Sequence, residues 1–159
     1  MKKNLIYLLI TIIFFSTTTA FATEKYNNIL STEYEYLEDG SYFVVTSEEI
    51  VDSDISILST VNTKKGSKTY TYYNNEGKKL WYVEVIGTFS YGNNSSKCTN
   101  STVIAKSNDS AWKIYSKSAS KSKNIATATV TAKRYIGAVL LNTINKSISL
   151  TCSPTGKLS

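Results

Sequence analysis

Residues 79–91 read KLWYVEVIGTFSY, and this stretch decides the fold class. Large apolar side chains recur at every second position from Trp81 onward, and the positions between them include the charged Glu84. A period of two residues is typical of a β-strand with one buried face. Gly87 interrupts the apolar face, and we expect a β-bulge there. The stretch therefore predicts one long strand in a β-sheet.

Segments on both sides of this strand have the same signature. Short alternating runs bounded by turn residues predict further strands at 69–73, 102–105 and 146–152. Two more strands align when Trp112 is placed opposite Val130, with a five-residue connection at 119–123. No stretch after residue 22 has the 3.6-residue apolar period of a helix. We therefore predict an all-β protein built as an antiparallel β-sandwich.

The spacing of Cys98, Trp112 and Cys152 is close to that of an immunoglobulin domain. Three features depart from that pattern. Leu150 stands where the tyrosine-corner residue belongs, Cys98 is expected in a turn rather than in an apolar strand, and too few residues follow Cys152 for the usual last strands. We therefore predict a sandwich of immunoglobulin-like appearance with its own topology.

A β-hairpin is expected ahead of this sandwich. Asp39-Gly40 separates two alternating runs, and this pair suits a two-residue type I′ turn. Such a turn fixes the register and places Tyr36 opposite Phe43. An isolated hairpin is marginal in water, so we expect its aromatic face to pack against the main sheet.

The first 22 residues have the three-part order of a secretory signal peptide. A short basic start (1–4) precedes an apolar run of 11 residues (5–15), and the segment ends in Ala20-Phe21-Ala22. This run is too short to cross a bilayer, which takes about 20 residues. We therefore predict cleavage after Ala22, no membrane span in the mature chain, and a secreted protein that is free or held at the cell wall by charge.

Charge divides the mature chain into two parts. Residues 23–63 contain nine acidic residues and one lysine, a net charge of −8, whereas residues 64–159 have a net charge of +12. An asymmetry of this size is a physical feature of the surface. We predict a signal peptide at 1–22, an acidic N-terminal segment with the β-hairpin at 23–63, and a basic β-sandwich domain at 64–159.

The chain contains two cysteines, which in an exported protein allow one internal disulfide, between Cys98 and Cys152. Closing a loop of that length would stabilise the fold by roughly 4 kcal/mol on the chain-entropy estimate. We favour this bridge. Two buried free thiols or an intermolecular bridge are the alternatives.

Several short motifs occur together in a combination that resembles a known family. They are LEDGSY at 37–42, GKKLW at 77–81, GTFSY at 87–91, SKC at 96–98, WKIYSKSAS at 112–120 and LTCS at 150–153. Over most of its mature length the chain resembles a family of small secreted proteins of low-GC Gram-positive bacteria, a domain of unknown function. The resemblance implies export and the pairing of Cys98 with Cys152, and it transfers no catalytic residue.

The chain contains no histidine. This excludes Ser-His-Asp and Cys-His catalysis and histidine-based zinc sites. Ser118 and Lys121 fit a Ser-x-x-Lys pattern, but we expect them in a solvated hairpin loop rather than in a pocket. Asp52 and Asp54 are spaced as in a calcium loop, but the glycine and glutamate of an EF-hand are missing. The sequence therefore predicts no catalytic residue, no cofactor and no metal site.

The most informative surface feature is a cationic β-hairpin. Its cations are Lys113, Lys117, Lys121, Lys123, Lys133 and Arg134. A concentrated positive surface attracts polyanions, and salt weakens the attraction. We expect anionic cell-wall polymers or lipid head groups as partners, because unpatterned lysines do not make a surface that reads nucleic-acid bases. A solvated, lysine-rich face without a ligand is the alternative.

A group of aromatic residues is a second binding candidate, because aromatic rings stack on sugars. These residues are Tyr70, Tyr72, Tyr73, Trp81 and Tyr82. Their more common role is a core on one face and a cross-strand ladder on the other.

We therefore predict a secreted, non-catalytic protein that binds a cell-envelope or extracellular polyanion. One alternative is a small extracellular hydrolase, which needs two carboxylates about 5 to 10 Å apart in a cleft. The candidate carboxylates are Glu33, Glu35, Glu48, Glu49, Asp52 and Asp54. The other alternative is a protein-interaction module, which needs an uncovered apolar patch. The sequence leaves the oligomeric state open.

Overall fold

The computed structural model describes residues 26–51 and 62–159, and its regular structure is entirely β. The strands are β1 (Tyr26–Tyr36), β2 (Tyr42–Val51), β3 (Asn62–Tyr73), β4 (Lys79–Gly92), β5 (Ser95–Ser107), β6 (Trp112–Ser122), β7 (Ile125–Ile136) and β8 (Val139–Thr151). The described part of the chain has no helix, and so none that is long and apolar enough to cross a membrane. The predicted all-β fold class is confirmed.

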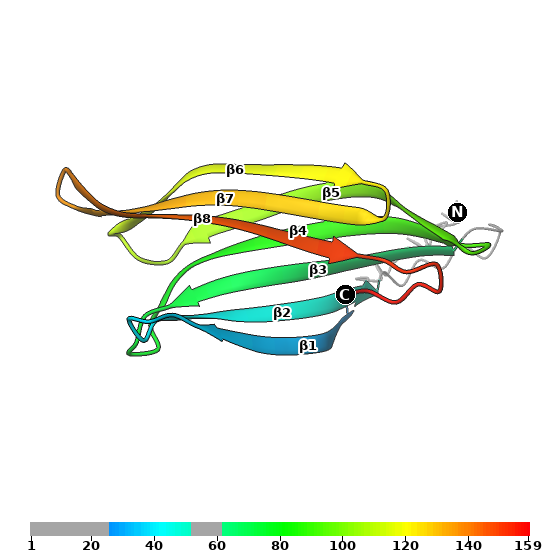
Figure 1. The fold of residues 1–159 in the computed structure, drawn as a ribbon, viewed down its shortest axis with the longest axis horizontal. Helices are drawn as coiled ribbons and strands as arrows, with labels where there is room; N and C mark the ends of the chain where they lie inside the picture. The colour runs from blue at the N-terminus through cyan, green and yellow to red at the C-terminus, as the bar shows by residue number, and fades with distance from the viewer. Residues whose placement is uncertain (1–25, 52–61) are drawn as a thin grey trace, which may run out of the picture.

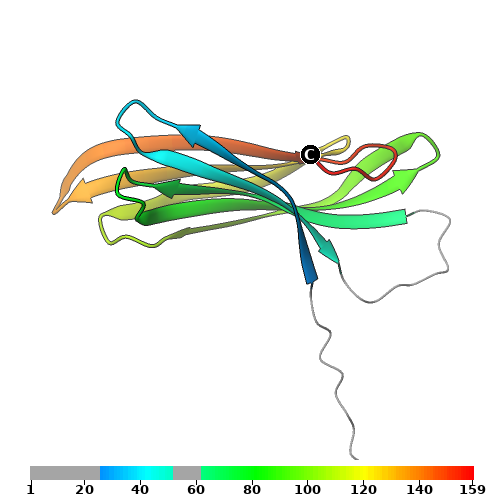
Figure 2. The ribbon, with the colours of Figure 1, turned by 90° about the horizontal axis from the view of Figure 1, so that it is seen from below.

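The strands form two antiparallel sheets that pack face to face (Figure 1). The five-stranded sheet has the order β1-β2-β3-β4-β5, and the three-stranded sheet has the order β6-β7-β8. Within each sheet every strand pairs with the next one in the chain, unlike the Greek-key order of immunoglobulin domains, so the sandwich has its own topology. The three-stranded sheet packs on β3, β4 and β5. Strands β1 and β2 lie beyond it, and Figure 2 shows β1 running at an angle to β7 and β8.

Strand β4 forms the centre of the core, as its alternation predicts. Trp81, Val83 and Val85 have 0% exposure. Strand β7 faces them with buried alanines at positions 126, 128 and 132. Large side chains of one sheet therefore pack against small ones of the other, which allows the two sheets to approach closely.

The bulge predicted at Gly87 lies elsewhere. Gly87 pairs with Gly66 on β3 and with Ser101 on β5 without a break in either ladder. The register of β4 and β5 shifts one residue later, where Thr99 is the extra residue. Because Gly87 is not a bulge, it must serve another purpose, which is the close approach of the two sheets.

The N-terminal hairpin forms, but its predicted register is wrong. Tyr36 pairs with Tyr42 rather than with Phe43. The connection is longer than two residues and closes with a bond from the Leu37 N–H to the Ser41 carbonyl (2.8 Å). Since side chains alternate with a period of two, this slip of one residue turns the tyrosines of β1 to the opposite face.

The predicted register of β6 and β7 is also wrong. Trp112 lies opposite Arg134 instead of Val130. The connection between the strands is the pair Lys123-Asn124 rather than residues 119–123. The strands are therefore longer than the sequence suggests, and the Ser/Lys-rich segment expected in a loop belongs to β6.

Backbone hydrogen bonds from outside this hairpin explain where it turns. The Cys98 N–H donates to the Lys123 carbonyl (2.7 Å), and the Cys152 N–H donates to the Asn124 carbonyl (3.1 Å). These bonds come from β5 and from the chain just after β8. Because they are tertiary contacts, the local sequence of the turn did not reveal them.

The acidic hairpin is continuous with the rest of the larger sheet. Strand β2 pairs with β3 along its length, and β3 begins at Asn62. The predicted signal peptide at 1–22 and the acidic residues Asp52 and Asp54 lie outside the described residues.

Candidate functional site

The β6–β7 hairpin of the three-stranded sheet contains all six cations predicted to bind a polyanion. Between Ser110 and Ser159 the chain has eight lysine and arginine residues and no acidic residue. Within the described residues, none of the six predicted cations forms an ion pair with a carboxylate. The charge of these six residues is therefore not neutralised by an ion pair, whereas Lys146 on β8 is paired with Glu35.

Lys113 and Lys133 form the centre of this positive surface. They are directly paired across β6 and β7 and lie on the outer face of the sheet. The Lys133 Nζ lies 3.4 Å from the ring centroid of Tyr115, and the Lys113 Nζ lies 5.4 Å from that of Tyr135. Each ammonium group is thus held over an aromatic ring by a cation–π contact, which positions the charge without neutralising it.

The other four predicted cations do not join this pair in one patch. Lys117 and Lys121 lie opposite the buried Val130 and Ala126, so they point to the inner side of the exposed edge strand β6. Lys123 lies in the turn at the far end of the hairpin. The structure therefore separates the six residues into several small groups.

Lys121 and Arg134 make contacts away from the outer face. The Lys121 ammonium donates to the Thr99 carbonyl on β5. Arg134 lies opposite Trp112 on the inner face of β7 and lines a cleft at that end of the sandwich. The Ser-x-x-Lys pair is likewise not in a pocket, because Ser118 is exposed and its hydroxyl contacts that of Thr129 (2.7 Å).

Rows of hydroxyl groups lie beside the lysine pair on the outer face of the three-stranded sheet. We call this surface the hydroxyl face; it consists of Ser118, Thr127, Thr129, Thr131, Ser147 and Ser149. Thr127 contacts Ser149 (3.0 Å), and Thr131 donates to the Asn145 side chain (2.8 Å). The Thr-x-Thr-x-Thr alternation at 127–131 is the signal for this face in the sequence.

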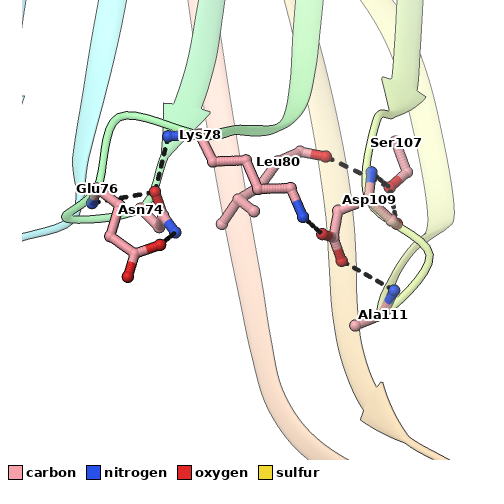
Figure 3. A network of polar contacts seen from close by, with 7 residues as sticks. All are labelled: Asn74, Glu76, Lys78, Leu80, Ser107, Asp109 and Ala111. Carbon is pink, nitrogen blue, oxygen red and sulfur yellow. Dashed lines mark hydrogen bonds and ion pairs between the residues drawn. The ribbon is translucent and has the colours of Figure 1, made fainter.

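The cleft beside Arg134 has a volume of about 440 Å³ and is ordered by a polar network (Figure 3). The Asp109 Oδ2 lies 2.5 Å from the Lys78 Nζ, and its Oδ1 accepts the Ala111 N–H (2.9 Å). The hydrogen bond from Lys78, together with the Ala111 N–H, holds the pKa of Asp109 below its usual value. Asn74 closes the neighbouring turn by accepting the Lys78 N–H (2.7 Å). These contacts give the network a structural role.

A second cleft, of about 490 Å³, lies between the N-terminal hairpin and the C-terminal residues. Its lining includes two of the candidate carboxylates, Glu33 and Glu49, together with Lys64 and Leu158. The Glu49 Oε1 lies 2.9 Å from the Lys64 Nζ. No group of three or more potential metal ligands occurs among residues 26–51 and 62–159.

The aromatic residues proposed to stack on sugars do not form one surface. Tyr72 and Trp81 belong to the core, at 4% and 0% exposure. Of the predicted residues, Tyr73 lies on the other face of the five-stranded sheet, where its ring belongs to a cluster with Tyr34, Tyr36 and Tyr42. The hairpin register creates this cluster, so the expected register concealed it.

The predicted Cys98–Cys152 disulfide is absent, and both cysteines are buried free thiols. The thiols are directed elsewhere: the Cys98 Sγ lies 3.1 Å from the Asn100 carbonyl, and the Cys152 Sγ lies 3.5 Å from the Ser153 carbonyl. Burial raises the pKa of both thiols. One of the predicted alternatives, two buried free thiols, therefore describes this structure.

Comparison of the chain with protein-family models, with curated proteins and with solved structures finds no match. No ligand, activity or partner is therefore transferred from another protein. The function is argued from the geometry of the three-stranded sheet and of the two clefts.

Proposed function

We propose that the protein is exported, non-catalytic, and binds a phosphate-bearing polyanion of the cell envelope through the outer face of its three-stranded sheet. The observation that carries this proposal is the charge of that sheet. Within β6, β7, β8 and the turn joining β6 to β7 there are seven lysine and arginine residues and no acidic residue, and Lys113 and Lys133 lie on the outer face. A surface with one sign of charge raises the local concentration of oppositely charged ligands and speeds their association.

The hydroxyl face supports a phosphate-bearing ligand in particular. In each hydroxyl pair, one group donates to the other, and the accepting hydroxyl keeps a proton for an external acceptor. Lys113 and Lys133 supply point charges at the end of these rows. Phosphate oxygens accept hydrogen bonds from both hydroxyl and ammonium groups, so a repeating phosphate chain fits the surface better than an apolar ligand does.

Export rests on the first 22 residues, with their basic start, apolar run and small-x-small end. A cell-envelope ligand follows from export, because wall polymers and lipid head groups are the polyanions that a secreted protein meets first. The absence of histidine removes the most common general base and agrees with a binding protein.

Binding to polyphosphate and to isolated cell walls tests the proposal. The mature chain should bind both at low salt and leave at about 1 M NaCl, where the Debye length is about 3 Å. Lys113→Gln with Lys133→Gln should weaken low-salt binding by about tenfold or more, at about 1 kcal/mol for each cation. Absence of binding at every ionic strength would reject the proposal.

A double substitution on the five-stranded sheet distinguishes binding by the proposed face from binding by net charge alone. Lys79 and Lys106 are exposed on β4 and β5, and Lys79→Gln with Lys106→Gln removes the same charge. We expect this pair to change binding by less than about twofold. If both pairs weaken binding equally, net charge rather than the proposed face binds the polymer.

The hydrolase is a second candidate, favoured by one observation. Glu33 and Glu49 line the same cleft, as a carboxylate mechanism requires. We rank the hydrolase below the binding function, because the Glu49 carboxylate already forms an ion pair with Lys64. Release of sugar from cell walls that is lost in both Glu33→Gln and Glu49→Gln would support the hydrolase.

A further inference from the structure

The β7–β8 hairpin ends in an apolar tip, and polyanion binding does not account for it. The tip is the uncharged run Ile136–Leu141, which turns at Gly137 and Ala138. Its large side chains are exposed: Ile136 63%, Val139 62%, Leu140 49% and Leu141 50%. Figure 1 shows this tip at one end of the long axis of the molecule, beyond the ends of the neighbouring strands.

Among the described residues, the tip lies outside the hydrophobic core. The Tyr135 N–H donates to the Ala111 carbonyl (2.7 Å), which joins the base of the hairpin to the chain before β6. Beyond that bond, Ile136 pairs only with Val139 across the turn. A Cβ at Gly137 would have no atom within 4 Å. A cluster of exposed apolar side chains without a structural role indicates a binding surface.

The surroundings of the tip indicate what it binds. Tyr115, which is 68% exposed, and Tyr135 lie at its base with Lys113 and Lys133 above their rings. Tyrosine and lysine together are typical of the boundary between lipid tails and head groups, where the ring lies in the apolar layer and the cation reaches phosphate. Arg134 adds a further cation one residue before the ring of Tyr135.

We propose that the tip Ile136–Leu141 inserts into the surface layer of an anionic lipid bilayer, while Lys113, Lys133 and Arg134 lie among the phosphates of the head groups. The three tip residues of β8, Val139 to Leu141, extend about 10 Å at about 3.4 Å per residue. This length matches the depth of about 5 to 10 Å that interfacial protein segments reach. The inference deepens the proposed function and rests on it for the cationic residues.

The shape of the tip favours lipid over a protein partner. The tip is convex and projects from the molecule, so a protein would have to offer it an apolar groove. The cleft beside Arg134 in a second copy is lined mainly by polar and charged side chains and offers no apolar groove of this kind. A fluid bilayer adapts to a projecting hairpin and needs no such groove.

Flotation with lipid vesicles tests the inference. Vesicles of mixed phosphatidylglycerol and phosphatidylcholine should bind the mature chain at low salt, and a fraction should stay bound at about 1 M NaCl, because apolar insertion is not screened. Leu140→Ser with Leu141→Ser should weaken partitioning by about tenfold or more. The matched control is Ile29→Ser with Ile104→Ser, which removes two exposed isoleucines (64% and 40%) far from the tip and should change partitioning by less than about twofold.

A fluorescent reporter gives a second readout. Both native tryptophans are buried, Trp81 at 0% and Trp112 at 4% exposure, so their emission should not respond to vesicles. Val139→Trp should show a blue shift with the mixed vesicles and quenching by brominated lipid tails, whereas Ile104→Trp should show neither. The absence of a shift and of quenching in Val139→Trp would overturn the inference.

Three outcomes separate this inference from the proposed function. If the serine tip variant floats as well as the unmodified chain, and salt releases both, the tip does not insert, and polyanion binding stands alone. Binding to polyphosphate without binding to vesicles likewise means that the tip does not insert. If sedimentation shows a dimer that the tip substitutions convert to a monomer without lipid, a second copy covers the tip and the inference is wrong.

Discussion

Gly87 on β4 lies directly against Ala126 on β7, where the two sheets of the sandwich meet. A Cβ at position 87 would lie 2.9 Å from the Ala126 Cβ and 2.6 Å from the ring of Phe89. These distances are too short for a carbon atom to fit without movement of its neighbours. The glycine therefore sets the spacing of the sheets, since its missing side chain makes room for the Phe89 ring.

Gly87→Ala should destabilise the protein by about 1–3 kcal/mol through overpacking. The free energy of unfolding in urea measures the effect. Combining Gly87→Ala with Ala126→Gly should recover part of the loss, because the second change removes one of the two clashing groups. Strict additivity of the two single substitutions would contradict the proposed contact.

Alternation within a strand could be predicted from the sequence, because it is a local property. The pattern at 79–91 identified β4 and its buried face, since every second side chain must point the same way. The all-β class followed from repeated alternation and the absence of a helical period. These conclusions required no knowledge of which strands are neighbours.

Registers could not be predicted, because distant contacts set them. The β6–β7 turn is held by Cys98 and Cys152, which lie far from it in the chain. The Asp39-Gly40 pair lies in the β1–β2 connection, but the Asp39 carboxylate also accepts the Ser41 N–H (3.0 Å), which favours a longer loop than a two-residue turn. The slip of one residue turned Tyr36 away from the face of Phe43, on which the predicted register had placed it.

The candidate site was predicted in part. Positive charge on the β6–β7 hairpin follows directly from composition, but the separation of its six cations depends on a register shift after Ile114. The apolar tip was missed, because the last strand was expected to begin at Lys146 and in fact begins at Val139. Uncharged apolar residues next to a glycine did not distinguish a protruding turn from a buried segment.

Asp109 should make the free energy of unfolding dependent on pH in the acidic range. Its pKa is lowered in the folded protein, so its contribution is present above the unfolded value of 3.8 and is lost as the pH falls through the folded pKa. Asp109→Asn keeps an oxygen for the Ala111 N–H but loses the charge that binds Lys78. We expect it to cost about 1 kcal/mol at pH 7, a value limited by the exposure of Lys78.

Urea unfolding at several pH values measures this effect. The difference between Asp109→Asn and the unmodified protein should shrink as the pH falls below 3.8. Asp109→Ala should cost more than Asp109→Asn at neutral pH, because it also leaves the Ala111 N–H without its acceptor. A difference that does not change between pH 7 and strong acid would show that the charge of Asp109 contributes nothing.

Lys146 should stabilise the contact between the two sheets. Its Nζ lies 2.7 Å from the Glu35 Oε1 on β1 and 4.5 and 4.9 Å from the ring centroids of Phe43 and Tyr70. Lys146→Ala should therefore destabilise the protein by about 2 kcal/mol, through the lost cation–π contacts and the lost packing of the stem. Lys146→Met, which keeps the stem, should cost about 1 kcal/mol. If Lys146→Met is as stable as the unmodified protein, only the stem matters and the charged contacts are without effect.

The two cysteines should behave as free, protected thiols. Because Cys98 and Cys152 are 2% and 0% exposed and burial raises the pKa of both, alkylation of the folded protein should be slow. In denaturant without reductant, mass spectrometry should detect two labels on each chain. A chain that takes up no label under those conditions has a disulfide, and the directions of the two thiols toward the Asn100 and Ser153 carbonyls would then be wrong. Cys98→Ser with Cys152→Ser provides the control, since it should take up no label.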